Sequence, residues 1–486
     1  MRQFSLVFLL TITCITTNVF CQQSIVFERT YTTLTVDTII GARCGVQCHD
    51  GGYMLGGYAA YGMYASEMML MKLDSLGNVQ WKKFYGEMPV SLNCINKVVQ
   101  LNDDSYICCG RGSFISGGSG LRPENSIIMR VDSHGNLMWY REFDAGWHEM
   151  LLDMELTETG VFCVGYAENN TKTRAFPLWI ICDLDGENSI VKTLPDWYNY
   201  QIFISSIANT PDNNYIFGGR AGNYSVLIKT NNVGDTIKTS LIGNGGYPGQ
   251  LSITALSNVN NNIVVLGYYT INVHDYDSQN YYAFYDTNLT FLRENILPFD
   301  NVLQLVNPTQ LITVSDNEFI IGGWLSVENR QEDIFIKKYN MNDELVWQRF
   351  MGGTGMENIY ELIHTSDGGY MVVGDSDSFN DWIAIYLVKT DSLGLGNYTS
   401  PVPEYLTGNN NIDIYPNPAT DRCILSIENY QNINYIEIFD IYGKSVEKIN
   451  ISENSTSLDI SGLASGIYIV TDNNRSFQRK LIKTNY

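Results

Sequence analysis

Most of the chain alternates between short apolar segments and turns rich in Asp, Asn and Gly. One representative stretch holds four such segments, at residues 95–101, 106–110, 127–131 and 137–143, and the first and third of them end at Asn-Asp-Asp and Asp-Ser-His-Gly-Asn turns. Short β-rich runs bounded by turn residues are the sequence pattern of β-strands. The stretch therefore predicts four consecutive strands.

The four-segment unit is repeated along the chain. An aromatic or aliphatic residue opens its second segment at Tyr53, Tyr106, Val161, Tyr215, Ile263, Phe319 and Tyr370. The spacings between these positions are 53, 55, 54, 48, 56 and 51 residues. A nearly fixed period indicates one supersecondary unit repeated around an axis, and four strands per unit are typical of a propeller blade. We predict an all-β fold, with a seven-bladed β-propeller of four-stranded blades at residues 22–395.

Two local features recur within the units. An Asp-x-x-Gly-Asn turn joins the third and fourth segments at Asp74 and Asp132, and more loosely at Asp183. Its Gly is explained by a turn position that requires a positive φ. A Trp recurs in the fourth segment, at Trp81, Trp139 and Trp347. We interpret this Trp as a wedge between neighbouring blades.

The seventh unit lacks its fourth segment. After residues 383–389 and a turn at 391–394, the chain continues into Ser400-Pro-Val-Pro. A matching segment lies near the N-terminus, where Ile25-Val-Phe-Glu-Arg-Thr-Tyr aligns with Val79-Gln-Trp-Lys-Lys-Phe-Tyr and Phe27 takes the position of Trp81. We predict that residues 25–31 form the outer strand of the last blade and remove its open edge. The repeats resemble those of secreted bacterial propellers with Asp-Gly-Gly-Tyr patterns, a resemblance that implies a fold and no particular chemistry.

Charge and composition narrow the function classes. The chain has 486 residues, of which 44% are hydrophobic and 12% aromatic, and its formal net charge is −22. The negative charge argues against a nucleic-acid partner, because such binding depends on Lys and Arg at the phosphates. An acidic surface keeps a secreted protein soluble, and we expect a monomer.

The N-terminus has the pattern of a secretory signal peptide. Arg2 supplies positive charge, residues 6–12 form an apolar core, and Cys21-Gln22 is a plausible cleavage point, which predicts a signal peptide at residues 1–21. Phe20 stands where a lipoprotein signal carries a small residue, which argues against lipid attachment at Cys21. The apolar run is too short to span a bilayer, so no membrane span is expected.

Eight cysteines follow the predicted cleavage point: Cys44, Cys48, Cys94, Cys108, Cys109, Cys163, Cys182 and Cys423. An oxidising compartment permits disulfides, but the spacings match no zinc site. Cys108, Cys109, Cys163 and Cys182 lie in apolar strand segments, where Cys behaves as a small buried hydrophobe. Cys44 paired with Cys48 or Cys94 is the one disulfide that the sequence leaves open.

Four motifs follow one another in the last part of the chain. They are Tyr415-Pro416-Asn417-Pro418, an aromatic-Asp-x-x-Gly turn from Phe439 to Gly443, a Leu463-x-x-Gly466-x-Tyr468 segment, and a basic terminal segment with Arg479 and Lys480. In this order and spacing they resemble the type A C-terminal sorting domain of the type IX secretion system of Bacteroidetes.

This resemblance implies where the protein is exported. It implies recognition by the type IX secretion machinery, export across the outer membrane, removal of the sorting domain, and release or attachment at the cell surface. It also implies a small β-sandwich at residues 412–486, after a linker at residues 396–411.

The loops of the predicted propeller fall into two groups. The turns between first and second strands and between third and fourth strands are short and similar, whereas the loops at the opposite end vary, for example at residues 111–125, 167–177, 270–280 and 375–381. Variable loops on a rigid scaffold are the usual place of binding sites. We therefore expect a ligand-binding face at the variable end.

Three clusters in these loops are candidate sites, and each has a plain structural alternative. Asp375, Asp377, Asn380 and Asp381 offer oxygen ligands suited to Ca²⁺, or they form a solvated turn. His274, Asp275 and Asp277 form a ligand group or a polar hairpin tip. Trp147, His148 and Glu149 include an aromatic platform for a sugar, unless Trp147 packs between blades.

The sequence assigns no catalytic residue. The five His are scattered over the repeats, and no nucleophile elbow or phosphate-binding glycine loop occurs in a strand–turn–helix context. Three functions stay open: a binding module for a glycan or protein, a polysaccharide-degrading hydrolase or lyase with acidic pairs in a central funnel, and a structural or adhesive surface protein. A funnel mouth rich in aromatic and Asn/Asp residues would favour glycan binding.

Overall fold

The computed structural model describes residues 25–32, 38–61, 65–86, 92–112, 125–171, 173–194, 201–243, 251–272, 277–297, 303–327, 332–379, 383–396, 412–427, 434–440, 444–472 and 478–484. The predicted signal peptide and nearly all of the predicted linker lie outside these residues. The described parts contain no helix long and apolar enough to cross a membrane.

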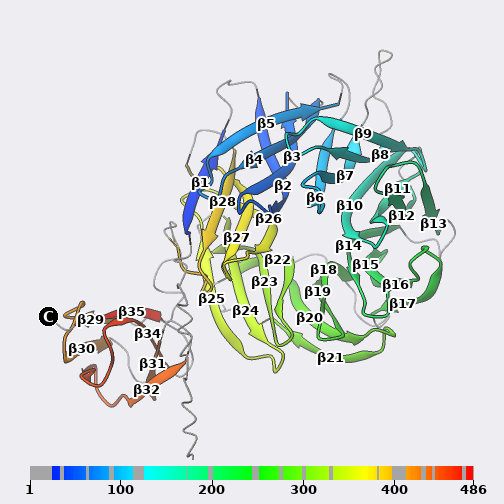
Figure 1. The fold of residues 1–486 in the computed structure, drawn as a ribbon. Helices are drawn as coiled ribbons and strands as arrows, with labels where there is room; N and C mark the ends of the chain where they lie inside the picture. The colour runs from blue at the N-terminus through cyan, green and yellow to red at the C-terminus, as the bar shows by residue number, and fades with distance from the viewer. Residues whose placement is uncertain are drawn as a thin grey trace, which may run out of the picture.

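The described residues up to 396 form seven antiparallel four-stranded sheets arranged around a central axis (Figure 1). The inner strands, which surround the axis, are β2 (Ile39–Gln47), β6 (Cys94–Gln100), β10 (His148–Leu156), β14 (Ile202–Asn209), β18 (Leu251–Val259), β22 (Leu303–Ser315) and β26 (Glu357–His364). The second strands are β3 (Tyr53–Ala60), β7 (Tyr106–Gly112), β11 (Gly160–Glu168), β15 (Tyr215–Ala221), β19 (Asn262–Asn272), β23 (Glu318–Val327) and β27 (Tyr370–Ser376).

The outer half of each blade completes the ring. The third strands are β4 (Ser66–Leu73), β8 (Asn125–Val131), β12 (Ala175–Asp183), β16 (Tyr224–Thr230), β20 (Asp277–Asp286), β24 (Glu332–Asn340) and β28 (Ala384–Thr390). The outermost strands are β5 (Val79–Tyr85), β9 (Leu137–Phe143), β13 (Ser189–Thr193), β17 (Thr236–Ile242), β21 (Phe291–Ile296), β25 (Leu345–Met351) and, for the seventh blade, β1 (Phe27–Tyr31). Each second strand begins at, or one residue before, the position that opens its repeat in the sequence, so the seven-bladed prediction is confirmed.

The N-terminal strand closes the ring as the sequence predicted. β1 pairs antiparallel with β28, with Phe27 opposite Lys389 and Tyr31 opposite Ile385. The Tyr31 hydroxyl donates to the Gly77 carbonyl at 2.6 Å. In the next pair of blades, the hydroxyl of Tyr85 makes the same bond to Gly135 at 2.7 Å. The seventh blade is therefore joined to the first by the same contact that joins the first to the second.

The recurring Trp is a wedge between blades. A Cβ built on Gly135 would lie 2.6 Å from the Trp81 ring of the preceding blade, and one on Gly77 would lie 2.9 Å from the Phe27 ring. Both glycines also have positive φ, 75° and 81°. The glycine of the Asp-x-x-Gly-Asn turn is thus required twice, for its backbone conformation and for the approach of an aromatic ring.

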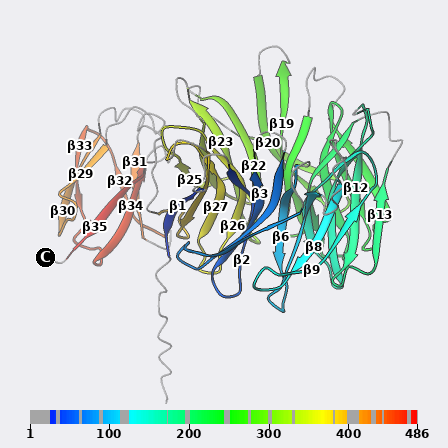
Figure 2. The same cartoon turned by 90° about the horizontal axis from the view of Figure 1, so that it is seen from above.

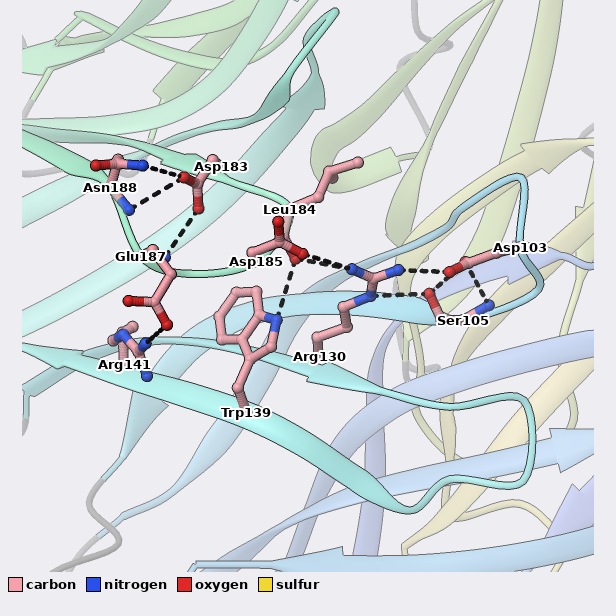
Figure 3. A network of polar contacts seen from close by, with 10 residues as sticks. All are labelled: Asp103, Ser105, Arg130, Trp139, Arg141, Asp183, Leu184, Asp185, Glu187 and Asn188. Carbon is pink, nitrogen blue, oxygen red and sulfur yellow. Dashed lines mark hydrogen bonds and ion pairs between the residues drawn. The ribbon is translucent and has the colours of Figure 1, made fainter.

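Figure 3 shows how one such junction is held between the second and third blades. Arg130 of β8 donates to the Ser105 hydroxyl at 3.0 Å and to the Leu184 carbonyl of the next blade at 2.8 Å. It is also ion-paired with Asp103. The Trp139 indole donates to the same Leu184 carbonyl at 3.1 Å. A turn of one blade is therefore tied to two strands of its neighbour.

The acidic residue of the Asp-Gly-Gly-Tyr turns has a structural partner. In five blades, a basic residue near the end of the third strand is paired with an acidic residue at the junction of the first two strands. The pairs are Lys72–Asp50, Arg130–Asp103, Lys229–Asp212, Lys338–Glu318 and Lys389–Asp367. Each of these basic side chains is buried, and a buried cation needs such a partner. This accounts for both polar positions of the repeat motif.

The C-terminal region forms two small sheets. β29 (Ile412–Tyr415), β30 (Arg422–Ile427) and β33 (Ser455–Asp459) form one sheet, and β32 (Ser445–Asn450), β31 (Tyr435–Phe439), β34 (Gly466–Asp472) and β35 (Gln478–Lys483) form the other. Buried side chains from both sheets make one core, which includes Leu425, Ile438, Leu458 and Val470. This is the predicted β-sandwich. Gly443 of the sorting motif lies outside the described residues.

All eight cysteines after residue 21 are buried and free. The disulfide left open for Cys44 is therefore not formed. Cys44 and Cys48 pack instead with apolar side chains between the first two blades, among them Met54 and Ile95.

Candidate functional site in the central channel

The two ends of the propeller differ in their loops. Because strands alternate in direction within each blade, the short turns lie at one end, here called the turn end, and the longer loops lie at the other, the variable end. The side view shows β19 and β20 rising beyond their neighbours at the variable end (Figure 2).

Every inner strand has a β-bulge at the same level of the channel. The bulged residues, here called the bulge ring, are Arg43, Asn96, Leu152, Ser205, Thr254, Thr309 and Tyr360. All seven line one central cavity of about 460 Å³. A bulge changes the direction in which a side chain points, so the ring sets the chemistry of the channel wall.

Four members of the bulge ring hold neighbouring blades together. Each donates from its side chain to the carbonyl of the residue before the bulge in the next blade. The bonds are Asn96 to Leu151 (2.8 Å), Ser205 to Ile253 (2.9 Å), Thr254 to Pro308 (2.9 Å) and Thr309 to Ile359 (3.4 Å). This regular pattern is structural.

The pattern breaks where the seventh blade meets the first. Tyr360 and Arg43 replace the small polar residues, and the Arg43 guanidinium carbon lies 4.1 Å from the centre of the Tyr360 ring. The Tyr58 ring centre is 5.5 Å from the same carbon. Leu152 of the third blade also departs from the pattern, because its side chain has no donor.

Asp375 holds Tyr360 in place. It accepts a hydrogen bond from the Tyr360 hydroxyl at 2.8 Å and one from the Asn358 amide at 3.2 Å. Burial raises the pKa of Asp375, while the bonds from Tyr360 and Asn358 oppose this. Arg43, Tyr58, Asn358, Tyr360 and Asp375 are here called the mouth cluster. Asn358 near the start of β26 and Asp375 near the end of β27 both adjoin the loops of the variable end, so the cluster lies toward that end.

A charged cluster follows directly below the bulge ring. Lys97 Nζ lies 3.1 Å from Glu361 Oε1 and 3.4 Å from Asp153 Oδ1. Asp153 Oδ2 also accepts from the Ser206 hydroxyl at 3.1 Å and the Ile207 amide at 3.0 Å. Burial opposes the charge on Lys97, but Glu361 and Asp153 outweigh it and raise the Lys97 pKa well above its usual value. The cluster therefore links the inner strands of four blades.

Glu155 lies two residues beyond Asp153 along β10, toward the turn end. Burial, and then the charge of Asp153, raises its pKa to about 7, against the opposing effect of Lys97. Its side chain lines the same cavity. The channel thus contains one carboxyl group that titrates near neutral pH.

The Trp147–Glu149 cluster predicted from the sequence is at the variable end, and its Glu has a structural role. The Glu149 carboxylate is buried and accepts from the backbone amides of Ala145, at 2.5 Å, and Gly146. Glu357 caps the equivalent loop of the seventh blade, accepting from the Gly353 amide at 3.0 Å. Trp147 is 42% exposed. A sugar platform at Trp147 stays a prediction.

The predicted calcium loop is described only in part. Asp375 belongs to the mouth cluster, and Asp377 accepts from the Met356 amide at 2.6 Å. Asn380 and Asp381 lie outside the described residues. Within the described ranges, no group of three or more His, Cys, Asp or Glu side chains is placed to hold a metal ion. Calcium binding by the whole loop stays untested.

His274 and Asp275 also lie outside the described residues. Asp277 begins β20 and pairs with Asn272 of β19, and its side chain is not described. The choice between a ligand group and a hairpin tip stays open.

Sequence reasoning missed the bulge ring, although the repeat contained a signal for it. Arg43 stands ten residues before Tyr53, and Tyr360 ten residues before Tyr370. The same offset places Asn96, Ser205 and Thr309 in three other units, and Thr254 stands nine residues before Ile263. Arg and Tyr are therefore visible as exceptions, but nothing in the sequence says that they meet.

Comparisons with known proteins agree with the sorting domain. Residues 413–484 match the model of the secretion system C-terminal sorting domain family. A search of curated proteins found no match.

Several solved structures have a similar arrangement at low identity. A protein of unknown function from Dyadobacter fermentans is 12% identical, with 63% of this chain and 97% of that chain covered and a TM-score of 0.43. A mutant NanB sialidase from Streptococcus pneumoniae is 10% identical, with 75% and 70% covered and a TM-score of 0.42. An α-L-arabinanase from Penicillium chrysogenum is 10% identical, with 61% and 92% covered and a TM-score of 0.42.

At these scores and identities we draw no conclusion about activity from the neighbours. The sorting-domain match covers the same segment and motifs as the resemblance found in the sequence, and the propeller is directly visible in the fold. The protein is therefore a cargo of the type IX secretion system, exported to the cell surface or the extracellular space, and its sorting domain follows a seven-bladed β-propeller.

Proposed function

We propose that the propeller is an extracellular binding module that takes one end of a saccharide into the mouth of its central channel. The observation that carries this proposal is the break in the bulge ring at the seventh and first blades. Four blades use a small polar residue at this position to bond the next blade, whereas two adjacent blades present Tyr360 and Arg43 instead. Exceptions to a structural repeat are the positions most available for function.

The size and lining of the channel support a small polar ligand. A volume of about 460 Å³ falls in the range of about 300–1,000 Å³ that is typical of ligand pockets. Trp324 of the sixth blade and Tyr360 of the seventh line the same cavity, so two aromatic side chains from adjacent blades are available to a ligand. Aromatic faces accept the apolar face of a sugar ring, because both bury carbon–hydrogen surface there.

The hydrogen-bonding state of the wall favours a ligand rich in hydroxyl groups. Ser205, Thr254 and Thr309 have already donated their protons to backbone carbonyls. A hydroxyl oxygen in that state can only accept further bonds. A polyhydroxyl ligand supplies the missing donors, whereas an apolar ligand would leave these oxygens without partners.

Two of the three acidic groups in the channel are engaged in ion pairs, which supports a binding role for them and leaves Glu155 as the acid to be tested for hydrolysis. Asp153 and Glu361 are both paired with Lys97, which orients the two carboxyl groups, while burial raises the pKa of Glu361 against the effect of Lys97. Neither carboxylate is left unpaired for general acid catalysis.

The test is a saccharide-binding screen with the full chain, followed by calorimetry on the saccharides that bind. Tyr360→Ala should weaken binding by at least tenfold, because it removes the ring and the Asp375 bond together. Tyr360→Phe, which keeps the ring, should lose much less. Leu76→Ala is the control, because Leu76 is 50% exposed and lies in the turn between β4 and β5, at the end of the propeller opposite the variable loops. Absence of saccharide binding, or binding that Tyr360→Ala leaves unchanged, would refute the proposal.

Product analysis of the same saccharides gives a second outcome. We expect recovery of intact saccharide after prolonged incubation. Release of shorter fragments, abolished by Glu155→Gln or Glu361→Gln, would instead establish the hydrolase alternative.

A further inference from the structure

Arg43 is half-buried and has no acidic partner among the described residues, in contrast to six other cations of the propeller. Lys72, Arg130, Lys229, Lys338 and Lys389 are each paired with an Asp or Glu. Lys97, which lines the channel beside Arg43, is paired with two carboxylates. Arg43 forms no ion pair with any residue that the structure describes. Its guanidinium group instead contacts the rings of Tyr360 and Tyr58.

These rings orient the guanidinium group rather than neutralise it. Cation–π contact of this kind fixes the plane of the guanidinium group. Tyr360 is itself held by its hydrogen bond to Asp375. Asp375 is the acidic group whose charge reaches Arg43, but its oxygens are already bound by Tyr360 and Asn358. The guanidinium donors of Arg43 are therefore held in one orientation and are not used by a carboxylate of the protein.

The position of Arg43 makes it available to a ligand. It belongs to the bulge ring, and its side chain lines the central cavity. A half-buried cation without a partner is costly, and an anionic ligand group removes that cost on binding. The net charge of −22 repels anions from the protein as a whole, so a local cation is needed wherever an anion is to bind.

We propose that the saccharide carries a carboxylate group and that Arg43 receives it. This proposal rests on the proposed function and adds the class of saccharide, which is one that ends in a uronate or a similar sugar acid. A planar guanidinium group matches a carboxylate through two parallel hydrogen bonds. The sugar ring then lies against Tyr360 or Trp324, and its hydroxyls reach the acceptor oxygens of Ser205, Thr254 and Thr309.

The experiment compares each acidic oligosaccharide with its neutral form. Calorimetry on the full chain would use oligomers of galacturonate, glucuronate or mannuronate, their methyl esters, and a sulfated oligosaccharide of similar length. For at least one sugar, we expect the acid to bind at least tenfold more tightly than its ester. The preference should shrink as salt is raised.

Substitution of Arg43 separates charge from hydrogen-bond geometry. Arg43→Gln should abolish the preference for the acid, so that acid and ester bind this variant with affinities within about twofold of each other. Arg43→Lys should restore part of the preference, because it keeps the charge and loses the planar fork. Arg422→Gln is the matched control, since Arg422 is an exposed arginine of the sorting domain. Melting temperatures of all variants show whether a loss reflects unfolding.

The outcomes distinguish this inference from the function on which it rests. Equal binding of acid and ester, tighter binding of the sulfated oligosaccharide, or an acid preference that persists in Arg43→Gln overturns the role of Arg43 as a carboxylate receptor. In each of those cases, binding that depends on Tyr360 leaves the proposed saccharide function standing. If no saccharide binds the wild-type chain, both proposals fail.

Discussion

The turn end of the propeller and the mouth of its channel are built from the same strands but follow different rules. At the turn end, Lys72 meets Asp50 and Lys389 meets Asp367 in equivalent positions, and an aromatic ring covers the turn glycine of the next blade. At the mouth, the bulged residues of four blades make the same hydrogen bond to the next blade, whereas Arg43 and Tyr360 do not follow this pattern. Repetition therefore identifies the groups that hold the ring together, whereas departure from it identifies groups that stability does not explain.

The largest expected effect breaks the ring itself. Deletion of residues 25–31 exposes the edge of β28 and the surface around Gly77 that the Phe27 ring covers. Exposed strand edges favour aggregation. Phe27 is 5% exposed, and loss of a buried Phe side chain alone costs about 3–5 kcal/mol. We expect a strongly lowered melting temperature and soluble oligomers, measured by calorimetry and light scattering. Phe27→Trp is the control and should be tolerated, since Trp81 fills this place in the first blade. A deletion variant that stays monomeric with an unchanged melting temperature would contradict the closure.

The second prediction tests the wedge at the turn end. Gly135→Ala combines a backbone strained at positive φ with a Cβ 2.6 Å from the Trp81 ring, and we expect a loss of about 3 kcal/mol. Gly51→Ala is the matched control, because Gly51 also has positive φ but open space around its Cβ. It should lose only about 1 kcal/mol. Equal losses in chemical denaturation would show that the ring contact contributes nothing.

The third prediction concerns the carboxyl group inside the channel. Because the folded pKa of Glu155 is raised to about 7, folding favours its protonated form, so its favourable contribution is complete at acidic pH and is lost as pH rises through 7. Glu155→Gln should therefore match the wild type near pH 4 and exceed its stability at pH 8 by on the order of 2 kcal/mol. Denaturant unfolding at both pH values measures this. A variant that is equally stable, or less stable, at pH 8 would show that Lys97 compensates the charge.

The smallest expected effect concerns the loop after β27. Asp377 accepts a hydrogen bond from the Met356 amide, and Asp377→Asn should cost about 1 kcal/mol through the weaker acceptor. We expect the same loss in millimolar calcium and in chelator, measured as a shift in melting temperature. If calcium raises the melting temperature of the wild type but not of this variant, the loop is a cation site after all.

The repeat made the fold largely predictable. Tyr53 and Tyr370 open equivalent strands because each unit carries its own turn residues and its own alternation of apolar side chains. The role of Phe27 was also predictable, because a single missing strand could be matched to a single unused segment. The sequence could not decide the pairing left open for Cys44, and the structure leaves Cys44 free among Met and Ile side chains between two blades.

The candidate site was much less predictable. The sequence directed attention to polar clusters such as Trp147–Glu149, where Glu149 turned out to bind the backbone of its own loop. Asp375 was suggested as a calcium ligand, and the structure shows it holding Tyr360. Local composition identifies polar groups but not the groups that face them.

The sequence by itself determined the export route, the number of blades and the closing strand, because each of these depends on motifs that are complete within one segment or one repeat. Only the tertiary structure decided the channel. Arg43 and Tyr360 belong to the first and last blades and meet because ring closure makes those blades neighbours. The bulge then turns both side chains toward the axis, and neither the closure distance nor the direction of a bulged side chain is encoded in any local pattern.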